Sequence, residues 1–180
     1  MKKGQKSLKL TVYLALLVAI SIIMGKYLAI RGGDIMRFSL ENMPIIFAGM
    51  AFGPVCGAAV GVVGDLVGCI MVGYTINPLV TVGAGAIGLL SGLGARFCNK
   101  LGISGPLKTV TAVSVAHIFG SVIIKTAGLA AYYTIPFSIL LLYRFLNYVI
   151  VGALDGVIVH ILLKNPAISA QVKEVRNNDL

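Results

Sequence analysis

The sequence predicts an all-α membrane protein in which six transmembrane helices form one compact bundle. Three observations predict this class: 58% of the 180 residues are hydrophobic, 12% are charged, and the mean hydropathy is +0.96. Soluble domains carry about 25% charged residues, and a helix needs about 20 predominantly apolar residues to cross the hydrocarbon core of a bilayer. We therefore expect residues 1–180 to form a single integral-membrane domain.

Apolar runs and the turn signals between them divide the chain into six predicted spans. These spans lie near residues 8–30, 38–51, 55–72, 78–97, 109–131 and 137–163. The first follows several lysines, but it is longer than the apolar core of a signal peptide and more spans follow, so we expect it to be retained. The second is short because the turn signal Phe52-Gly53-Pro54 ends it. Arg37 and Glu41 then lie at the membrane edge.

Glycines at helical spacing distinguish the third and fourth predicted spans. In the third span they are Gly53, Gly57, Gly61, Gly64 and Gly68, and in the fourth they are Gly85, Gly88 and Gly92. Small residues on one helix face let two backbones approach closely within a membrane. The pattern therefore predicts tight packing of these two spans, and it needs no ligand to explain it.

Basic residues indicate how the chain is oriented, because Lys and Arg accumulate on the cytoplasmic side of short loops. With the N-terminus inside, ten of the 15 basic residues fall on the inner side: Lys2, Lys3, Lys6, Lys9, Arg96, Lys100, Lys108, Lys164, Lys173 and Arg176. Both termini are therefore predicted to be cytoplasmic. The net charge of +9 does not indicate nucleic-acid binding, since these residues are spread over loop ends rather than over one folded face. We expect contact with membrane lipid instead.

Motifs for catalysis or for nucleotide binding are absent from the sequence. It contains no Gly-x-x-x-x-Gly-Lys-Ser/Thr loop, no His-Glu-x-x-His pair and no Gly-x-Ser-x-Gly elbow. His117 and His160 stand alone in apolar runs, and the three cysteines have no paired spacing. We therefore expect no enzyme activity, no catalytic residues, and no metal or cofactor bound by this chain.

Polar residues gather on the predicted outer side and supply the candidate binding site. The candidates are Arg31, Arg37, Glu41, Tyr74, Asn77, His117, Lys125, Tyr132, Arg144 and Asn147. Arginine pairs with carboxylates and tyrosine stacks on flat rings, so this set suits an anionic, planar ligand. Lys125, Arg144 and Asn147 lie within predicted spans. There an internal pair with Glu41 or with an acid inside a span is the alternative to ligand binding.

Two acids, Asp65 and Asp155, lie inside apolar spans, each next to a glycine. An acid at the bilayer centre costs roughly 2.5 to 3.5 kcal/mol on insertion scales, so it usually faces a partner, water or a ligand. Each is either a proton or sodium site, as in an ion-coupled carrier, or a structural partner of a helix end or a basic residue. The sequence pattern leaves both alternatives open.

The first span carries Ala15 and Ala19, a small-x-x-x-small pair that is by itself only a weak signal of contact with a partner helix, since alanine is common in such helices. The segment Arg37-Phe38-Ser39-Leu40-Glu41-Asn42-Met43-Pro44, with Phe52-Gly53-Pro54 and Asp65-Leu66 after it, resembles the S components of energy-coupling-factor (ECF) vitamin transporters. The folate-specific members are the closer match, since Val72 to Pro78 resembles that subfamily too. The likeness covers essentially the whole chain, and the two alanines match the motif by which these subunits dock.

The resemblance implies a compact S-component bundle that binds one vitamin from outside, under a long loop between the first two spans. Such a subunit then joins a T-type transmembrane coupling subunit and two ATPase subunits, which use the ATP. It implies folate as the ligand and the bacterial plasma membrane as the location of a multi-pass protein. The alternatives are an S component for another vitamin, a stand-alone ion-coupled carrier, and a membrane enzyme or scaffold subunit.

With folate as the implied ligand, each candidate residue has an expected role that follows from the position and chemistry of its side chain. Folate has a flat pterin and a tail with two carboxylates. The expected roles are hydrogen bonds to the pterin edge from His117 and Asn147, stacking by Tyr74 and Tyr132, and carboxylate binding by Arg31, Arg37 or Lys125.

Overall fold

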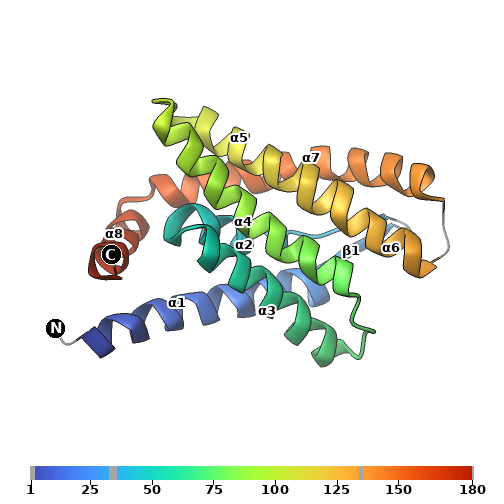
Figure 1. Ribbon diagram of the computed structural model, residues 1–180, viewed down its shortest axis with the longest axis horizontal. Helices are drawn as coiled ribbons and strands as arrows, with labels where there is room; N and C mark the ends of the chain where they lie inside the picture. The colour runs from blue at the N-terminus through green and yellow to red at the C-terminus, as the bar shows by residue number, and fades with distance from the viewer. Residues whose placement is uncertain (1–2, 33–35, 134–135, 180) are drawn as a thin grey trace.

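The computed structural model describes residues 3–32, 36–133 and 136–179, without the side chains of residues 3–7, 31–32, 36–37, 133 and 177–179. In chain order its elements are α1 (Lys3–Ile22), η1 (Ile23–Tyr27), β1 (Ile30–Gly32), β2 (Met36–Phe38), α2 (Asn42–Phe52), α3 (Pro54–Val72), α4 (Pro78–Lys100), α5 (Gly105–Ala116), η2 (His117–Ile124), α6 (Lys125–Tyr133), α7 (Phe137–Lys164) and α8 (Pro166–Asp179) (Figure 1). The segments η1 and η2 are π-helical turns that continue α1 and α5.

Five helical stretches in the described part of the chain are long and apolar enough to cross a membrane. They are Leu8–Tyr27, Pro54–Val72, Pro78–Lys100, Gly105–Tyr132 and Phe137–Lys164. The remaining predicted span corresponds to α2, which has 11 residues. At 1.5 Å per residue α2 is about 16 Å long, whereas the hydrocarbon core is about 30 Å thick. The helical class is thus confirmed, but a sixth helix of full spanning length is not.

The direction of the helices shows how α2 contributes to the bundle. A Cβ on Gly64 would lie 3.6 Å from Ser21 Oγ, and one on Gly68 would lie 2.8 Å from Lys26 Cε, so α1 and α3 run parallel. The segment between them must therefore return along the bundle, and α2 with the strands makes that return. Figure 1 shows both termini at one end of the molecule. Their cytoplasmic location stays a prediction.

Glycines allow α3 and α4 to pack backbone against backbone, as their spacing predicts. A Cβ on Gly88 would collide with the carbonyl carbon and oxygen of Gly57, and a Cβ on Gly61 would collide with the Ala84 carbonyl. A Cβ on Gly92 would lie 2.7 Å from the Gly49 carbonyl oxygen, so α2 joins the same contact. Close approach of this kind gains dispersion energy where no hydrophobic effect operates.

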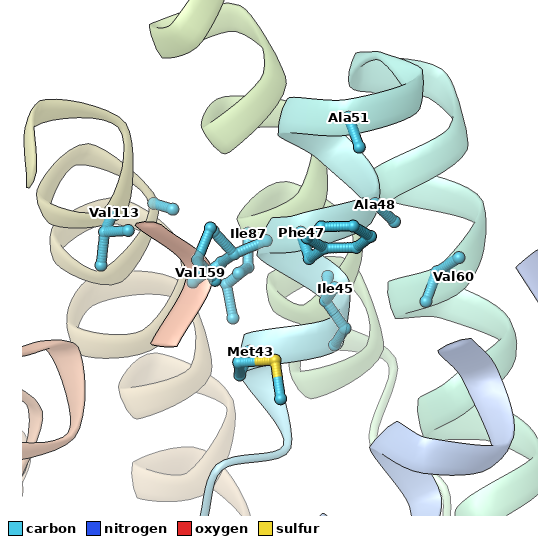
Figure 2. Close-up of a cluster of buried hydrophobic side chains, with 11 residues drawn as sticks. Met43, Ile45, Phe47, Ala48, Ala51, Val60, Ile87, Val113 and Val159 are labelled. Atoms are coloured by element: carbon cyan, nitrogen blue, oxygen red, sulfur yellow. The ribbon is translucent and has the colours of Figure 1, made fainter. Parts of the chain in front are cut away.

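The core is centred on α2, which is apolar around its whole circumference and therefore buried. Ile46 and Ala48 are fully buried, and they belong to one cluster with Ile87 of α4 and Val159 of α7. Figure 2 shows Ile87 and Val159 next to the side chains of α2, with Val113 of α5 beyond them. Helices from both halves of the chain thus meet on α2.

Two features of the structure lie outside the sequence prediction. Strands β1 and β2 form a short antiparallel ladder in which Arg31 is opposite Arg37, and β2 lies against α7. Helix α8 packs on α1 and α7 at the end of the bundle that holds the termini. There Lys9 Nζ is 2.8 Å from Glu174 Oε1, and Tyr13 donates a hydrogen bond to Gln171.

Candidate functional site

An ion pair connects the segment after the hairpin to the fifth predicted span. Lys125 begins α6, and its Nζ donates to Glu41 Oε1 at 3.1 Å and to Asn42 Oδ1 at 3.4 Å. The Lys125 side chain is only 4% exposed, and that of Glu41 is 21% exposed. Because a desolvated ammonium is costly without a partner, this contact holds the start of α2 against α6. The internal pair is therefore the alternative that the structure shows for Lys125.

The first span contacts the same residue, Glu41, from the other side. Ser21 Oγ donates to the Glu41 carbonyl oxygen at 2.8 Å. Gly25 in η1 leaves room for the side chain, because a Cβ there would lie 2.6 Å from Glu41 Oε2. Glu41 is thus surrounded by α1, α2 and α6, and its position depends on all three.

A second acid, Asp65, is held by hydroxyl and thiol groups nearby. Thr81 Oγ1 donates to Asp65 Oδ2 at 2.7 Å, and Cys69 Sγ lies 3.9 Å from Oδ1. Lys26 Nζ lies 3.8 Å from Cys69 Sγ and 5.6 Å from the centroid of the Tyr74 ring. Tyr74 therefore has a cation over its face, a favourable arrangement.

The space between these two acid groups is small. A cavity of about 10 Å³ is lined by Lys26, Glu41, Asp65 and Lys125, among others. Such a volume corresponds to about one water-sized probe. In this structure the polar side chains of this group therefore contact one another and do not enclose a space of vitamin size.

A buried histidine–aspartate pair joins the fifth and sixth predicted spans. His117 Nε2 is 3.0 Å from Asp155 Oδ2, and Nδ1 is 3.1 Å from Ser121 Oγ. Asp155 is fully buried, and its Oδ1 has no hydrogen-bond partner among the described residues. The His117 ring lies 5.1 Å from the Tyr148 ring. Of the two alternatives for Asp155, the structure shows a protein partner, and this partner is a histidine.

Arg144 joins the same group from α7. Its Nη2 donates to the Ser121 carbonyl oxygen at 3.0 Å and to the Tyr148 hydroxyl at 3.3 Å. Its guanidinium carbon lies 5.2 Å from the centroid of the Tyr148 ring. The Nε atom is buried and has no hydrogen-bond partner within the described residues. Because this N–H is buried, a ligand carboxylate can reach it only if neighbouring side chains move.

A groove of about 600 Å³ lies between α5–η2 and α7. Most of its walls are apolar, and His117, Phe145, Tyr148 and His160 contribute rings to it. Gly152 brings α7 close to the histidine, since a Cβ there would lie 3.3 Å from His117 Cδ2. Ligand pockets typically measure about 300 to 1,000 Å³ and combine apolar walls with a few polar groups. This groove meets both criteria.

The remaining predicted site residues have separate positions in the structure. Asn77 caps α4 by accepting from the Leu79 amide at 3.1 Å, and its Nδ2 donates to the Gly128 carbonyl at 2.8 Å, so it holds structure. Asn147 is buried in α7, whereas Tyr132 is 52% exposed. The side chains of Arg31 and Arg37 lie outside the described part of the structure. The binding roles of all these residues stay predictions.

Tyr148 and Thr81 are among the contacting residues that the sequence did not single out as site candidates. Tyr148 lies four residues after Arg144, a spacing that puts two side chains on one helix face and was available as a signal. Thr81 pairs with an acid 16 positions away on another helix, and no spacing rule indicates that contact.

Comparisons with known proteins place the fold. No curated protein matches the chain. It resembles the crystal structure of FolT bound with folic acid, with TM-score 0.67 and 18% identity over 84% of this chain and 90% of that one. It also resembles the S-component for biotin from an ECF-type ABC transporter, with TM-score 0.69 and 21% identity over 96% and 99% of the two chains. These two likenesses show the fold. Residues 5–168 match the family of the ECF-type riboflavin transporter S component, which confirms the resemblance to ECF S components, and the chain belongs to that family.

Proposed function

We propose that this chain is the vitamin-binding S subunit of an ATP-driven importer in the bacterial plasma membrane. It takes folate from the outer side and delivers it inward with a T-type transmembrane subunit and two ATPase subunits. Membership of the S-component family supports the subunit role, and five helices of spanning length support the membrane location. In this proposal ATP is hydrolysed by the partners.

Arg144 is the observation that carries the choice of an anionic ligand. Its buried Nε has no acceptor among the described residues, while the rest of the guanidinium is fixed against Tyr148 and Ser121. Because Nη2 already donates to Ser121 and Tyr148, the Nε–H is available for a single charge-assisted hydrogen bond to a carboxylate, which is stronger than a bond between neutral groups. Tyr148 lines the groove beside it and offers an aromatic face for a flat ring. Folate carries both groups that this arrangement suits.

Riboflavin is the second candidate, because the family that the chain matches is described by that vitamin. Its isoalloxazine ring is flat and would also suit the aromatic walls of the groove. Riboflavin has no carboxylate, however, and it would leave the Arg144 Nε without an acceptor. The two vitamins therefore make different demands on Arg144.

Calorimetric titration of the purified chain with folate, riboflavin, biotin and thiamine tests the proposal. We expect tight one-to-one binding of folate alone. In the Arg144→Lys variant the charge remains but the guanidinium geometry is lost, so folate affinity is expected to fall at least about tenfold. Lys100→Ala, on an exposed residue at the end of α4, is the matched control.

The outcomes separate the ligand from the class of protein. Tight binding of riboflavin, unchanged in Arg144→Lys, would replace folate and keep the S-subunit role. Folate binding that is unchanged in Arg144→Lys would remove Arg144 from the site. If none of the four vitamins binds, the proposed function is wrong, and uptake by vesicles that contain this chain alone would test the ion-coupled alternative.

A further inference from the structure

A cavity of about 280 Å³ lies at the end of the bundle that holds the termini, and it shares no lining residue with the groove or with the small cavity beside the Glu41–Lys125 pair. It is bounded by α1, the end of α2, the start of α3, the end of α4, and by α5 and α8. Its polar lining residues are Arg96 and Asn99 of α4, Lys108 of α5 and Arg176 of α8. No acidic residue lines it within the described part of the chain.

The three cationic side chains have no protein partner in the described structure. Arg96, Lys108 and Arg176 make no hydrogen bond or ion pair with any described residue. The nearby acid on α8, Glu174, is bound to Lys9 at 2.8 Å and does not line the cavity. Three positive charges from three helices thus line one cavity, with Arg96 and Arg176 exposed and Lys108 partly buried.

Arg96 lies beside a helix N-terminus, which is a second source of positive potential at this cavity. Gly53 precedes α3 with a φ of 110°, and no side chain caps that helix. A Cβ on Gly53 would lie 3.1 Å from Arg96 Nη2, so the guanidinium is next to the N-terminus of α3. A helix N-terminus carries roughly half a positive charge, which repels a neighbouring cation. An anion between the two would be attracted by both.

The positive-inside rule accounts for the sign of these charges but not for their convergence on a cavity. The remaining walls include apolar side chains, among them Leu10, Met50, Phe52 and Val175, which suit an aliphatic group. Basic pockets between membrane helices are known to bind the headgroups of anionic lipids. We propose that Arg96, Lys108 and Arg176 bind a phosphate group at the N-terminus of α3. A phospholipid headgroup and a soluble phosphate share this chemistry.

Two binding measurements on the full chain in detergent distinguish these sources. Native mass spectrometry with phosphatidylglycerol tests the lipid, with phosphatidylcholine as the zwitterionic comparison, and calorimetry tests inorganic phosphate. We expect phosphatidylglycerol to be retained in preference to phosphatidylcholine. Arg96→Ala is expected to weaken retention about tenfold, as for the loss of one charged hydrogen bond. Lys100→Ala removes a charge one turn later on the same helix without touching the cavity.

Each outcome bears on the proposal. Preferential retention of phosphatidylglycerol that depends on Arg96 supports a lipid site, and phosphate binding with the same dependence supports a soluble ligand. Equal effects of Arg96→Ala and Lys100→Ala, or no binding of either probe, would overturn it. Lys108→Ala and Arg176→Ala provide independent tests if Arg96→Ala fails to fold. Binding that survives both would also overturn it, and folate titration of all variants reports separately on the proposed function.

Discussion

At the scale of single residues, the contact between Lys125 and Glu41 decides how charge is accommodated inside the bundle. The two side chains come from segments 84 positions apart, and Lys125 is almost completely buried. Breaking a fully buried pair typically costs about 3 to 5 kcal/mol, because one charge remains unpaired. Glu41 is partly exposed, so water can replace some of what it loses.

We predict that Lys125→Met lowers the free energy of unfolding by about 2 kcal/mol, below the range for fully buried pairs. The remaining Glu41 carboxylate loses its ammonium partner, while the methionine fills much of the same volume. Thermal unfolding in detergent measures the change. Adding Glu41→Gln should recover part of the loss, because it removes the charge left behind. A Lys125→Met variant as stable as the original chain would show that the pair contributes nothing.

The sequence indicates which residues need a partner inside the bundle, but it does not indicate which residue that partner is. Isolated charges in apolar spans predict internal pairs, and Lys125 with Glu41 was among the alternatives. The pairing of His117 with Asp155 was not predicted, because it depends on α7 lying beside η2. Spacing along one helix predicts contacts three or four residues apart. It carries no information on which two helices are neighbours.

At the scale of helices and strands, the length and composition of the apolar stretches were sufficient to predict the long helices. Stretches of about 20 apolar residues form helices in a bilayer because every backbone group must be satisfied within the segment. The hairpin β1–β2 has three residues in each strand, too few for an alternating pattern to be recognised. Helix α8 is polar on much of its surface, and its contacts with α1 depend on the fold. These two elements therefore had no signal of comparable strength.

The α3–α4 contact makes a prediction that belongs to these elements. Gly88→Ala places a methyl group against the Gly57 backbone, which cannot move without separating the two helices. Overpacking typically costs about 1 to 3 kcal/mol, and a backbone obstacle favours the upper end. Gly156→Ala is the matched control, since a Cβ there meets no atom within 4 Å. Thermal unfolding of the two variants compares them, and equal melting temperatures would contradict the packing argument.

At the scale of the whole molecule, the bundle is packed unevenly around α2. Helices α2, α3 and α4 are joined by close backbone contacts, whereas α1 has one face against α3 and another exposed. Ala15 and Ala19 lie on that exposed face, with large apolar side chains such as Val12 and Leu16 beside them. In membrane proteins small residues on a helix face allow close contact with another helix. The structure therefore leaves available the surface that the proposed docking requires.

Ala15→Trp tests that surface at the level of the assembly. We expect the variant to bind vitamin as the original chain does, because the Ala15 side chain is exposed whereas Ser21 and Gly25, which contact Glu41, are buried. A bulky indole would prevent close approach of a partner helix, so co-purification with the T-type subunit and the ATPases should be lost. Ala59→Trp, on an exposed face of α3, is the matched control and should assemble normally. Normal assembly of Ala15→Trp would place the docking surface elsewhere, whereas loss of vitamin binding would show that α1 shapes the site.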